Sequence, residues 1–340
     1  MEPLIQAIQT DPLINGYTAN EVSFKTSAYA DDLTVFISSG SDALRVEYWM
    51  DTFSKASGAT FNQNKSEAIF HLFSAPVTRF TVLDSLATFR YLGVPCSFKL
   101  NLKDAWSPLI TKFKNKILDW SKPHINLSLS GKVTALKSYA LPLLTYQASF
   151  LPIPPEHLEE IKKISRNFLW SGKKSKVSKD TLSLPKDEGG LNFPDIGSIF
   201  NSLKARWVVR LLDPSNHEWK SLAAWAIGNI NADYGHGLSC LYCPGSSHDS
   251  NKALSPFWSE ATLAFWKLKP TLSLTGEDPG TFARCMPLFN NPVIQLNGRP
   301  LKGNRWKSLA RKGICRMADI IFNNRLGSLD DLSKFYGKIP

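Results

Sequence analysis

The sequence predicts an α+β fold in which short strands come first and helices follow. Before residue 98, short runs rich in β-branched and aromatic residues, such as residues 33–38 and 89–94, are separated by turn-forming residues, a composition typical of strands. From about residue 100 onwards, apolar residues recur at the three- and four-residue spacing of amphipathic helices. With 340 residues, the chain is long enough for two domains or one large domain.

Residues 1–98 are expected to form a small antiparallel sheet with one or two helices. A short helix over residues 3–10 precedes the first strands, and a longer helix runs from residue 42 to about 56. Gly58 ends this helix, because glycine readily adopts the left-handed conformation of helix C-termini. The strands are expected at residues 22–27, 33–38, 67–73, 79–83 and 89–94.

Helices are expected to dominate residues 99–212. In the first of them, residues 103–120, Lys112, Lys114 and Lys116 are expected on the side opposite the apolar stripe. That stripe is Trp106, Ile110, Phe113, Ile117 and Trp120. A helix over residues 128–150 is expected to bend or split at Pro142. Another opens at Pro155 and ends at Gly172. The last, residues 196–212, is expected to turn Ile199, Leu203, Trp207 and Leu211 inward.

Residues 213–340 are richer in Gly, Pro, Ser and Trp, and their periodicity is weak. Residues 299–316 contain seven Lys or Arg and no acidic residue, and residues 317–322 are expected to form a helix. The sequence therefore divides into three regions, residues 1–98, 99–212 and 213–340.

The balance of charges favours a polyanionic partner, of which nucleic acid is the commonest. Forty Lys and Arg against 29 Asp and Glu give a net charge of +11; the alternative is a basic protein with no such partner. Five scattered cysteines do not form a secreted disulfide framework. Because no run is long enough to span a membrane and the N-terminus lacks a signal peptide, we expect an intracellular protein, in nucleus or cytoplasm, with no membrane partner.

Two adjacent aspartates, Asp31 and Asp32, lie in the sequence Tyr29-Ala-Asp-Asp32 between two strand-like runs. A hairpin turn at this point can aim carboxylates out of the sheet, and hard cations such as Mg²⁺ prefer oxygen ligands. The alternative is an ordinary turn, because aspartate is common in turns for local hydrogen-bonding reasons.

Several motifs accompany Tyr29-Ala-Asp-Asp32 in a fixed order: residues 57–66, 89–95, 127–132, 166–172 and 184–191. In this order they resemble the reverse transcriptase of non-LTR (LINE-type) retrotransposons, closely over residues 1–212 and more faintly beyond. The resemblance implies a partial reverse-transcriptase palm over residues 1–98 and a helical thumb-like region over 99–212, followed by a basic C-terminal region over 213–340.

The resemblance also implies roles for individual residues. Asp31 is implied to be a catalytic, metal-binding carboxylate for Mg²⁺, with Asp32 in a supporting role. Lys65 matches the lysine that helps to protonate the leaving pyrophosphate, with a solvated turn lysine as the alternative. The primer-grip hairpin, which holds the primer end, is matched by Phe89, Tyr91, Leu92 and Gly93; the alternative is simple strand packing.

The implied parent reaction is RNA-directed DNA synthesis with two Mg²⁺ ions on an RNA template and a DNA primer. The family places a second aspartate on an earlier strand, whereas here 28 residues precede Tyr29. Asp11 lies in a turn close to the motif and is not expected to take that role. We therefore expect a remnant that is inactive alone; the alternatives are a non-catalytic RNA- or DNA-binding fragment and a degraded element with no selected function.

Basic side chains on or beside the predicted helices are candidates for phosphate contacts. They are Lys112, Lys114, Lys116, Lys162, Lys163, Arg166, Lys173 and Lys174, followed by the basic residues of 299–316; the alternative is a solvated helix face. Trp106, Trp120, Trp170 and Trp306 could stack on bases or belong to the core. Cys240 and Cys243, with His236 and His248, have zinc-ligand types but lack the usual zinc-finger spacing.

Overall fold

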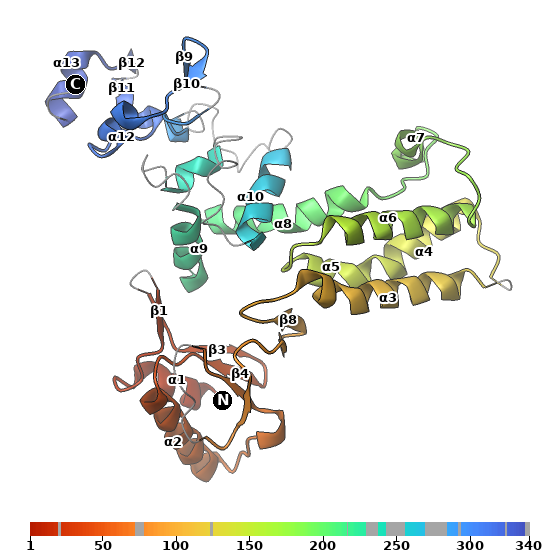
Figure 1. Cartoon of the computed structure of the whole chain (residues 1–340), viewed down its shortest axis with the longest axis horizontal. Helices are drawn as coiled ribbons and strands as arrows, with labels where there is room; N and C mark the ends of the chain where they lie inside the picture. Colours follow the sequence, from red (N-terminus) through yellow and green to blue (C-terminus); the bar gives the residue numbers. More distant parts are fainter. Residues whose placement is uncertain are drawn as a thin grey trace. The chain divides into compact units, whose positions relative to one another are not determined.

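The computed structural model describes residues 1–19, 22–71, 78–122, 125–215, 217–228, 237–242, 256–268, 284–291, 294–323 and 325–336. The chain forms two compact units, Met1–Leu100 and Asn101–Pro340, which are described separately (Figure 1). The first unit combines short strands with helices, and the second is mainly helical. This mixed composition agrees with the α+β class that the sequence predicts.

Two helices, α1 (Glu2–Thr10) and α2 (Gly40–Ser57), pack against each other in the first unit. The side chain of Ser39 accepts a hydrogen bond from the backbone N–H of Asp42 at the start of α2, and Gly58 ends the helix with φ +70°. The helix predicted over residues 42–56 is therefore confirmed. The core of this unit contains Leu4, Ile8, Ile14, Val46 and Met50.

The strands of the first unit form two-stranded pairs, and the prediction of one antiparallel sheet is wrong for the described residues. Three pairs are antiparallel neighbours in sequence: β1 (Tyr17–Ala19) with β2 (Val22–Phe24), β3 (Thr26–Tyr29) with β4 (Asp32–Val35), and β7 (Phe89–Tyr91) with β8 (Val94–Cys96). In contrast, β5 (Glu67–Ile69) and β6 (Thr81–Leu83) run parallel.

The second unit begins with a helical bundle of α3 (Leu102–Trp120), α4 (Leu129–Ala135), α5 (Pro142–Ala148) and α6 (Pro155–Trp170). A π-helical stretch, η2 (Leu136–Ala140), joins α4 to α5, so the predicted split at Pro142 is confirmed. The indole N–H of Trp106 donates a hydrogen bond to the Pro152 carbonyl inside this bundle. The largest buried side chains include Trp106, Phe113, Leu136, Leu144, Ile161 and Leu169.

Helix α8 (Ile196–Leu212) is rotated relative to the predicted stripe. Leu211 is buried as expected, but Ile199 and Leu203 are only partly buried. The helix runs from one core to another: its start packs into the bundle, and its later half packs against α10 (Pro256–Leu268). Because α8 packs against the bundle and against α10 on different sides, its buried face is wider than the predicted stripe. This face is formed by Ile196, Phe200, Lys204, Ala205, Val208 and Leu211.

The remaining elements are short. They are α7 (Lys179–Ser183), α9 (Glu218–Gly228), η4 (Gly237–Tyr242), β9 (Gln295–Leu296), β10 (Arg299–Pro300), α12 (Asn304–Ala310), η8 (Met317–Ile320), β11 (Ile321–Phe322), β12 (Arg325–Leu326) and α13 (Leu329–Tyr336). The helix predicted over residues 317–322 is wrong, because only a 3₁₀ turn forms before β-branched Ile321 enters a strand. In the ranges given above, no helix has the length and apolarity needed to cross a membrane.

Candidate functional site

The Asp31–Asp32 sequence lies at the tip of the β3–β4 hairpin. In this hairpin Thr26 pairs with Val35 and Tyr29 pairs with Asp32, which leaves Ala30 and Asp31 as the two turn residues. Ala30 has φ +53°, a left-handed conformation that is uncommon for any residue with a Cβ. Such conformations carry strain and cluster at functional sites. The predicted hairpin is present, with Asp31 in its turn and Asp32 at the start of β4.

The two faces of this hairpin differ. Leu33 and Val35 pack against the core of the first unit. Because side chains alternate along a strand, Asp32 belongs to the other face, together with its cross-strand neighbour Tyr29. Tyr29 is 68% exposed, and both aspartates are exposed as well. The hairpin thus presents carboxylates and a phenol away from the core.

A second hairpin contacts the same face of β3. The hydroxyls of Ser27 and Tyr91 are 2.9 Å apart, and Ser27 shares the face of Tyr29 by strand alternation. Tyr91 ends β7, and the turn to β8 is formed by Leu92 and Gly93, with φ +47° and +81°. The structure therefore brings Tyr91, and with it the hairpin of Phe89, Leu92 and Gly93, next to the aspartate hairpin.

Lys65 is not brought to the aspartates by any contact in the described part of the chain. It is exposed at the end of the 3₁₀ turn η1 (Gln63–Lys65), directly before β5. Among the described residues, no hydrogen bond or ion pair joins its ammonium group to Asp31 or Asp32. Its proposed role in proton transfer stays a prediction.

The hairpin by itself does not complete a two-ion magnesium site. Within the residues the structure describes, no three His, Cys, Asp or Glu side chains gather where they could hold a metal ion. The nearby sequence offers Asp11, but its buried carboxylate accepts hydrogen bonds from Trp49 Nε1 and Arg45 Nε, each at 2.6 Å. Those bonds occupy Asp11 in the core of the first unit, so it does not join Asp31 and Asp32 at the hairpin.

The three lysines of α3 do not share one face, contrary to the prediction. Lys114 forms an ion pair with Glu160 of α6, 2.5 Å from Nζ to Oε1. Lys112 and Lys116, one helical turn apart, point to the opposite flank, because residues two apart on a helix lie far round its axis from each other. The charge of Lys114 is therefore compensated within the bundle by Glu160. Lys112 and Lys116 lie on the other flank of α3, away from this ion pair.

The basic residues on and after α6 also divide into two groups. Lys162 pairs with Glu159 at 2.6 Å, which compensates its charge. Lys163 and Arg166 are exposed on α6, and Lys173 and Lys174 are exposed in the loop after it. Nearby, the ammonium of Lys132 donates to the Leu169 carbonyl and to Ser171 Oγ, at 3.4 and 2.6 Å; this lysine stabilises the C-terminal end of α6.

The structure bears on two further sets of residues, the tryptophans that could stack on bases and the cysteines with zinc-ligand types. Trp106 is fully buried, and Trp120, Trp170 and Trp306 pack partly buried against core clusters; the core interpretation is confirmed for Trp106. Cys240 is buried in a core with its thiol against the Ile227 carbonyl. The other proposed zinc ligands, His236, Cys243 and His248, lie outside the described residues.

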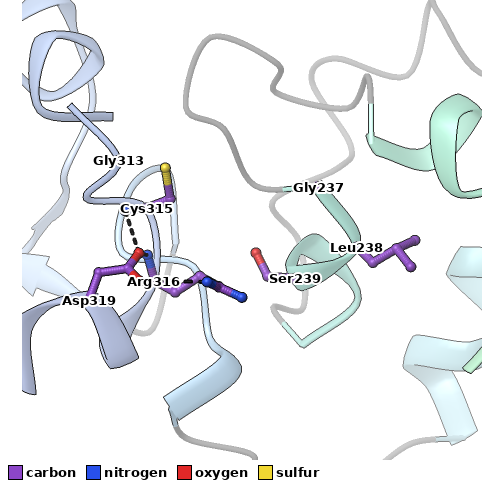
Figure 2. Close-up of a pocket in the computed structure, with 7 residues that line it drawn as sticks. All are labelled: Gly237, Leu238, Ser239, Gly313, Cys315, Arg316 and Asp319. Atoms are coloured by element: carbon purple, nitrogen blue, oxygen red, sulfur yellow. Dashed lines mark hydrogen bonds and ion pairs between the residues drawn. The ribbon is translucent and has the colours of Figure 1, made fainter. Parts of the chain in front are cut away.

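A cavity of about 320 Å³ lies between η4 and residues 313–319 in the second unit (Figure 2). The backbone N–H groups of Cys315 and Arg316 both donate to one carboxylate oxygen of Asp319, at 2.8 and 2.7 Å. The Arg316 guanidinium is 3.6 Å from the same carboxylate. Because Asp319 offsets this positive charge, the cavity has no concentrated charge of either sign.

Sequence reasoning missed an exposed aromatic surface on η2 and α5. Tyr139 is 52% exposed and Tyr146 is 51% exposed, with Leu143 between them at 38%. The signal that could have found them is their spacing, since residues four and then three apart share one face of a helix. That face does not contain the buried Leu136, Leu141 and Leu144.

No family model matches the chain. The chain is similar to a Xenopus laevis protein described as "Transposon TX1 uncharacterized 149 kDa protein", with 26% identity over 278 residues that cover 79% of the chain and 21% of that protein. It is also similar to the Arabidopsis thaliana "Putative ribonuclease H protein At1g65750", with 25% identity over 122 residues, or 34% of the chain and 19% of that protein. The chain spans about a fifth of the length of these relatives. These distant similarities fit a retrotransposon origin.

Proposed function

We propose that the chain is part of a reverse transcriptase from a non-LTR (LINE-type) retrotransposon, and that its β3–β4 hairpin belongs to the polymerase site. The observation that carries this proposal is the hairpin itself, in which exposed Asp31 and Asp32 follow the left-handed Ala30. Tyr91 contacts the same face through Ser27. The similarity to a transposon protein supports the same origin.

Asp31 and Asp32 supply the hard oxygen ligands that Mg²⁺ prefers, and Mg²⁺ supplies charge stabilisation in phosphoryl transfer. One hairpin offers only one part of a two-ion site, so the unaided chain is expected to be inactive as a polymerase. The proposed role of the β7–β8 hairpin is to position a primer end beside the aspartates. Tyr91 holds this hairpin against β3 through its hydroxyl.

RNA template and DNA primer are the partners that this function requires. A net charge of +11 favours binding to phosphate backbones. The name of the Arabidopsis thaliana relative, "Putative ribonuclease H protein", fits a nucleic-acid partner. We therefore assign the exposed basic residues Lys163, Arg166, Lys173 and Lys174 to phosphate contacts within this proposal.

Primer extension tests the proposal. The chain is assayed alone and as a fusion in which it replaces the aligned region of the Xenopus laevis relative, with RNA template, DNA primer and Mg²⁺. We expect no extension by the chain alone and RNA-dependent extension by the fusion. Asp31→Asn should abolish the extension, because an amide is a weaker Mg²⁺ ligand than a carboxylate.

Asp187→Asn is the matched control, because Asp187 is an exposed turn residue of the second unit and should leave extension unchanged. A fusion that binds primer and template yet extends no primer would contradict the proposal. So would extension that Asp31→Asn does not reduce.

A further inference from the structure

The exposed aromatic surface lies where the helix between Leu129 and Ala148 changes its winding. Tyr139 belongs to the π-helical stretch η2, and Leu143 and Tyr146 belong to α5. Single π-helical stretches are frequent at functional sites. Tyr139 also contacts the ring of Trp120, with 5.3 Å between centroids, and Tyr146 contacts the ring of Phe150 at 5.2 Å. Each tyrosine is thus supported on one side while about half of it remains exposed to solvent.

Two lysines of α3 lie along this surface. Ala105, Lys112, Lys116 and Trp120 recur at helical spacing and form one stripe of α3. Both ends of the stripe contact η2 and α5: Gln147 donates a hydrogen bond to the Ala105 carbonyl at 3.0 Å, and Trp120 contacts Tyr139. Lys112 and Lys116 lie between these two contacts in the sequence of α3. Helix α3 runs beside η2 and α5, so the two lysines border the helix that carries the tyrosines.

The charge along this stripe is positive. Lys112 is exposed, and no carboxylate in the described part of the chain lies within ion-pair distance of its ammonium. Asp119 is the acidic residue on this flank, and it is paired with Lys122 at 2.9 Å. Lys116 also lowers the pKa of Asp119, so Asp119 offsets part of its charge, whereas Lys112 keeps its charge. The surface formed by Lys112, Lys116, Tyr139 and Tyr146 therefore combines net positive charge with exposed aromatic rings.

We propose that this four-residue surface binds single-stranded nucleic acid. Tyrosine rings offer stacking platforms for unpaired bases, and the neighbouring lysines contact the phosphates. A duplex fits less well, because its bases already stack on each other and leave only the backbone for the protein. The inference rests on the proposed function, since a reverse transcriptase handles an unpaired template strand, and it adds a binding site outside the aspartate and Tyr91 hairpins.

Fluorescence anisotropy with a labelled 20-nucleotide single strand of RNA or DNA tests the aromatic part. We expect Tyr139→Ala and Tyr146→Ala each to weaken binding about fivefold or more. Tyr139→Phe and Tyr146→Phe keep the ring and should bind as the wild type does. Circular dichroism on each variant separates loss of stacking from loss of fold. Alanine variants that are folded and bind like the wild type would overturn the proposal.

Salt titration tests the lysines. Lys112→Ala with Lys116→Ala should lower the slope of log affinity against log salt by about 1.4, since each phosphate contact on a single strand contributes about 0.7. The control is Lys55→Ala with Lys99→Ala, the same loss of charge at two exposed positions of the first unit. Equal slopes of log affinity against log salt in both double variants would overturn the site. It would also be overturned if an RNA–DNA duplex bound as tightly as the single strand and lost as much affinity with Tyr146→Ala. Primer extension by the fusion is measured separately, so failure of this site is distinguishable from failure of the polymerase assignment.

Discussion

At the scale of single residues, Asp11 shows how hydrogen bonding decides the role of a carboxylate. Its pKa is lowered from 3.8 to about 2, chiefly by the hydrogen bond from Trp49, and further by the Leu13 backbone N–H and by Arg45. Burial opposes these effects. An ionised Asp11 therefore joins the turn after α1 to α2, and it is unavailable to a metal while these bonds persist.

The lowered pKa of Asp11 predicts an acid dependence of stability. The folded carboxylate keeps its charge at a pH where the unfolded one is already protonated, so its contribution is present above about pH 4 and is lost as the pH falls through about 2. Asp11→Asn should lower the free energy of unfolding and reduce this pH dependence. Urea unfolding followed by tryptophan fluorescence at pH 5 and at pH 2.5 measures both. Asp31→Asn, in the exposed turn, is the control and should keep the wild-type loss of stability between pH 5 and pH 2.5. An equal loss in Asp11→Asn and the wild type would show that Asp11 is not the source of this pH dependence.

At the scale of elements, α8 and α10 meet around a buried ammonium group. Lys204 Nζ lies 3.8 Å from Glu260 Oε2 and 5.0 Å from the centroid of the Phe257 ring, without a hydrogen bond to either. Desolvation by burial lowers the pKa of Lys204 to about 8, and Glu260 opposes that shift. Burial likewise raises the pKa of Glu260. The helix pair thus holds a charge that the unfolded chain would hydrate.

Because the pKa of buried Lys204 is lowered, we expect the second unit to gain stability in alkaline solution. Between about pH 8 and pH 10.5 the unfolded lysine binds a proton that the folded one has lost, so the free energy of unfolding rises with pH across this window. Lys204→Met should remove the rise, because methionine has a similar length and no charge. Urea unfolding monitored by circular dichroism at pH 7.5 and pH 10 is the measurement. Lys163→Met, an exposed position on α6, is the control that should keep the rise.

At the scale of the whole molecule, the chain consists of two compact units that meet in sequence at Leu100 and Asn101. Each has its own hydrophobic core: the first around α1 and α2, and the second around the α3–α6 bundle with a further cluster between α8 and α10. Separate cores are the property expected of parts that can unfold separately.

Limited proteolysis tests this division. Phe98 and Lys99 are exposed just before α3, so trypsin should cut after Lys99 before it cuts within the α3–α6 bundle. Mass spectrometry should identify fragments 1–99 and 100–340, and the second should keep a cooperative thermal transition. Lys99→Gln should remove this early cleavage. First cuts within α3 or α6, with the bond after Lys99 intact, would show that the division is wrong.

The sequence alone determined the elements whose signals are local. Helix α2 has Ser39 at its start and Gly58 at its end, and the helical spacing within α3 and α6 needs no distant partner to be recognised. The β3–β4 hairpin follows from two strand-like runs joined by a short turn. These features depend on residues that are neighbours along the chain, so the position of Asp31 in the turn could be predicted.

Only the tertiary structure decided which faces meet. It paired Lys114 with Glu160, placed Tyr91 beside Ser27, and rotated α8 towards α10. It also made β5 and β6 parallel. Helical spacing shows which residues share a face but not which element will cover it, because that choice depends on packing between segments far apart in sequence. The spacing of Tyr139 and Tyr146 is visible in the sequence, but only the packing left their shared face exposed beside α3.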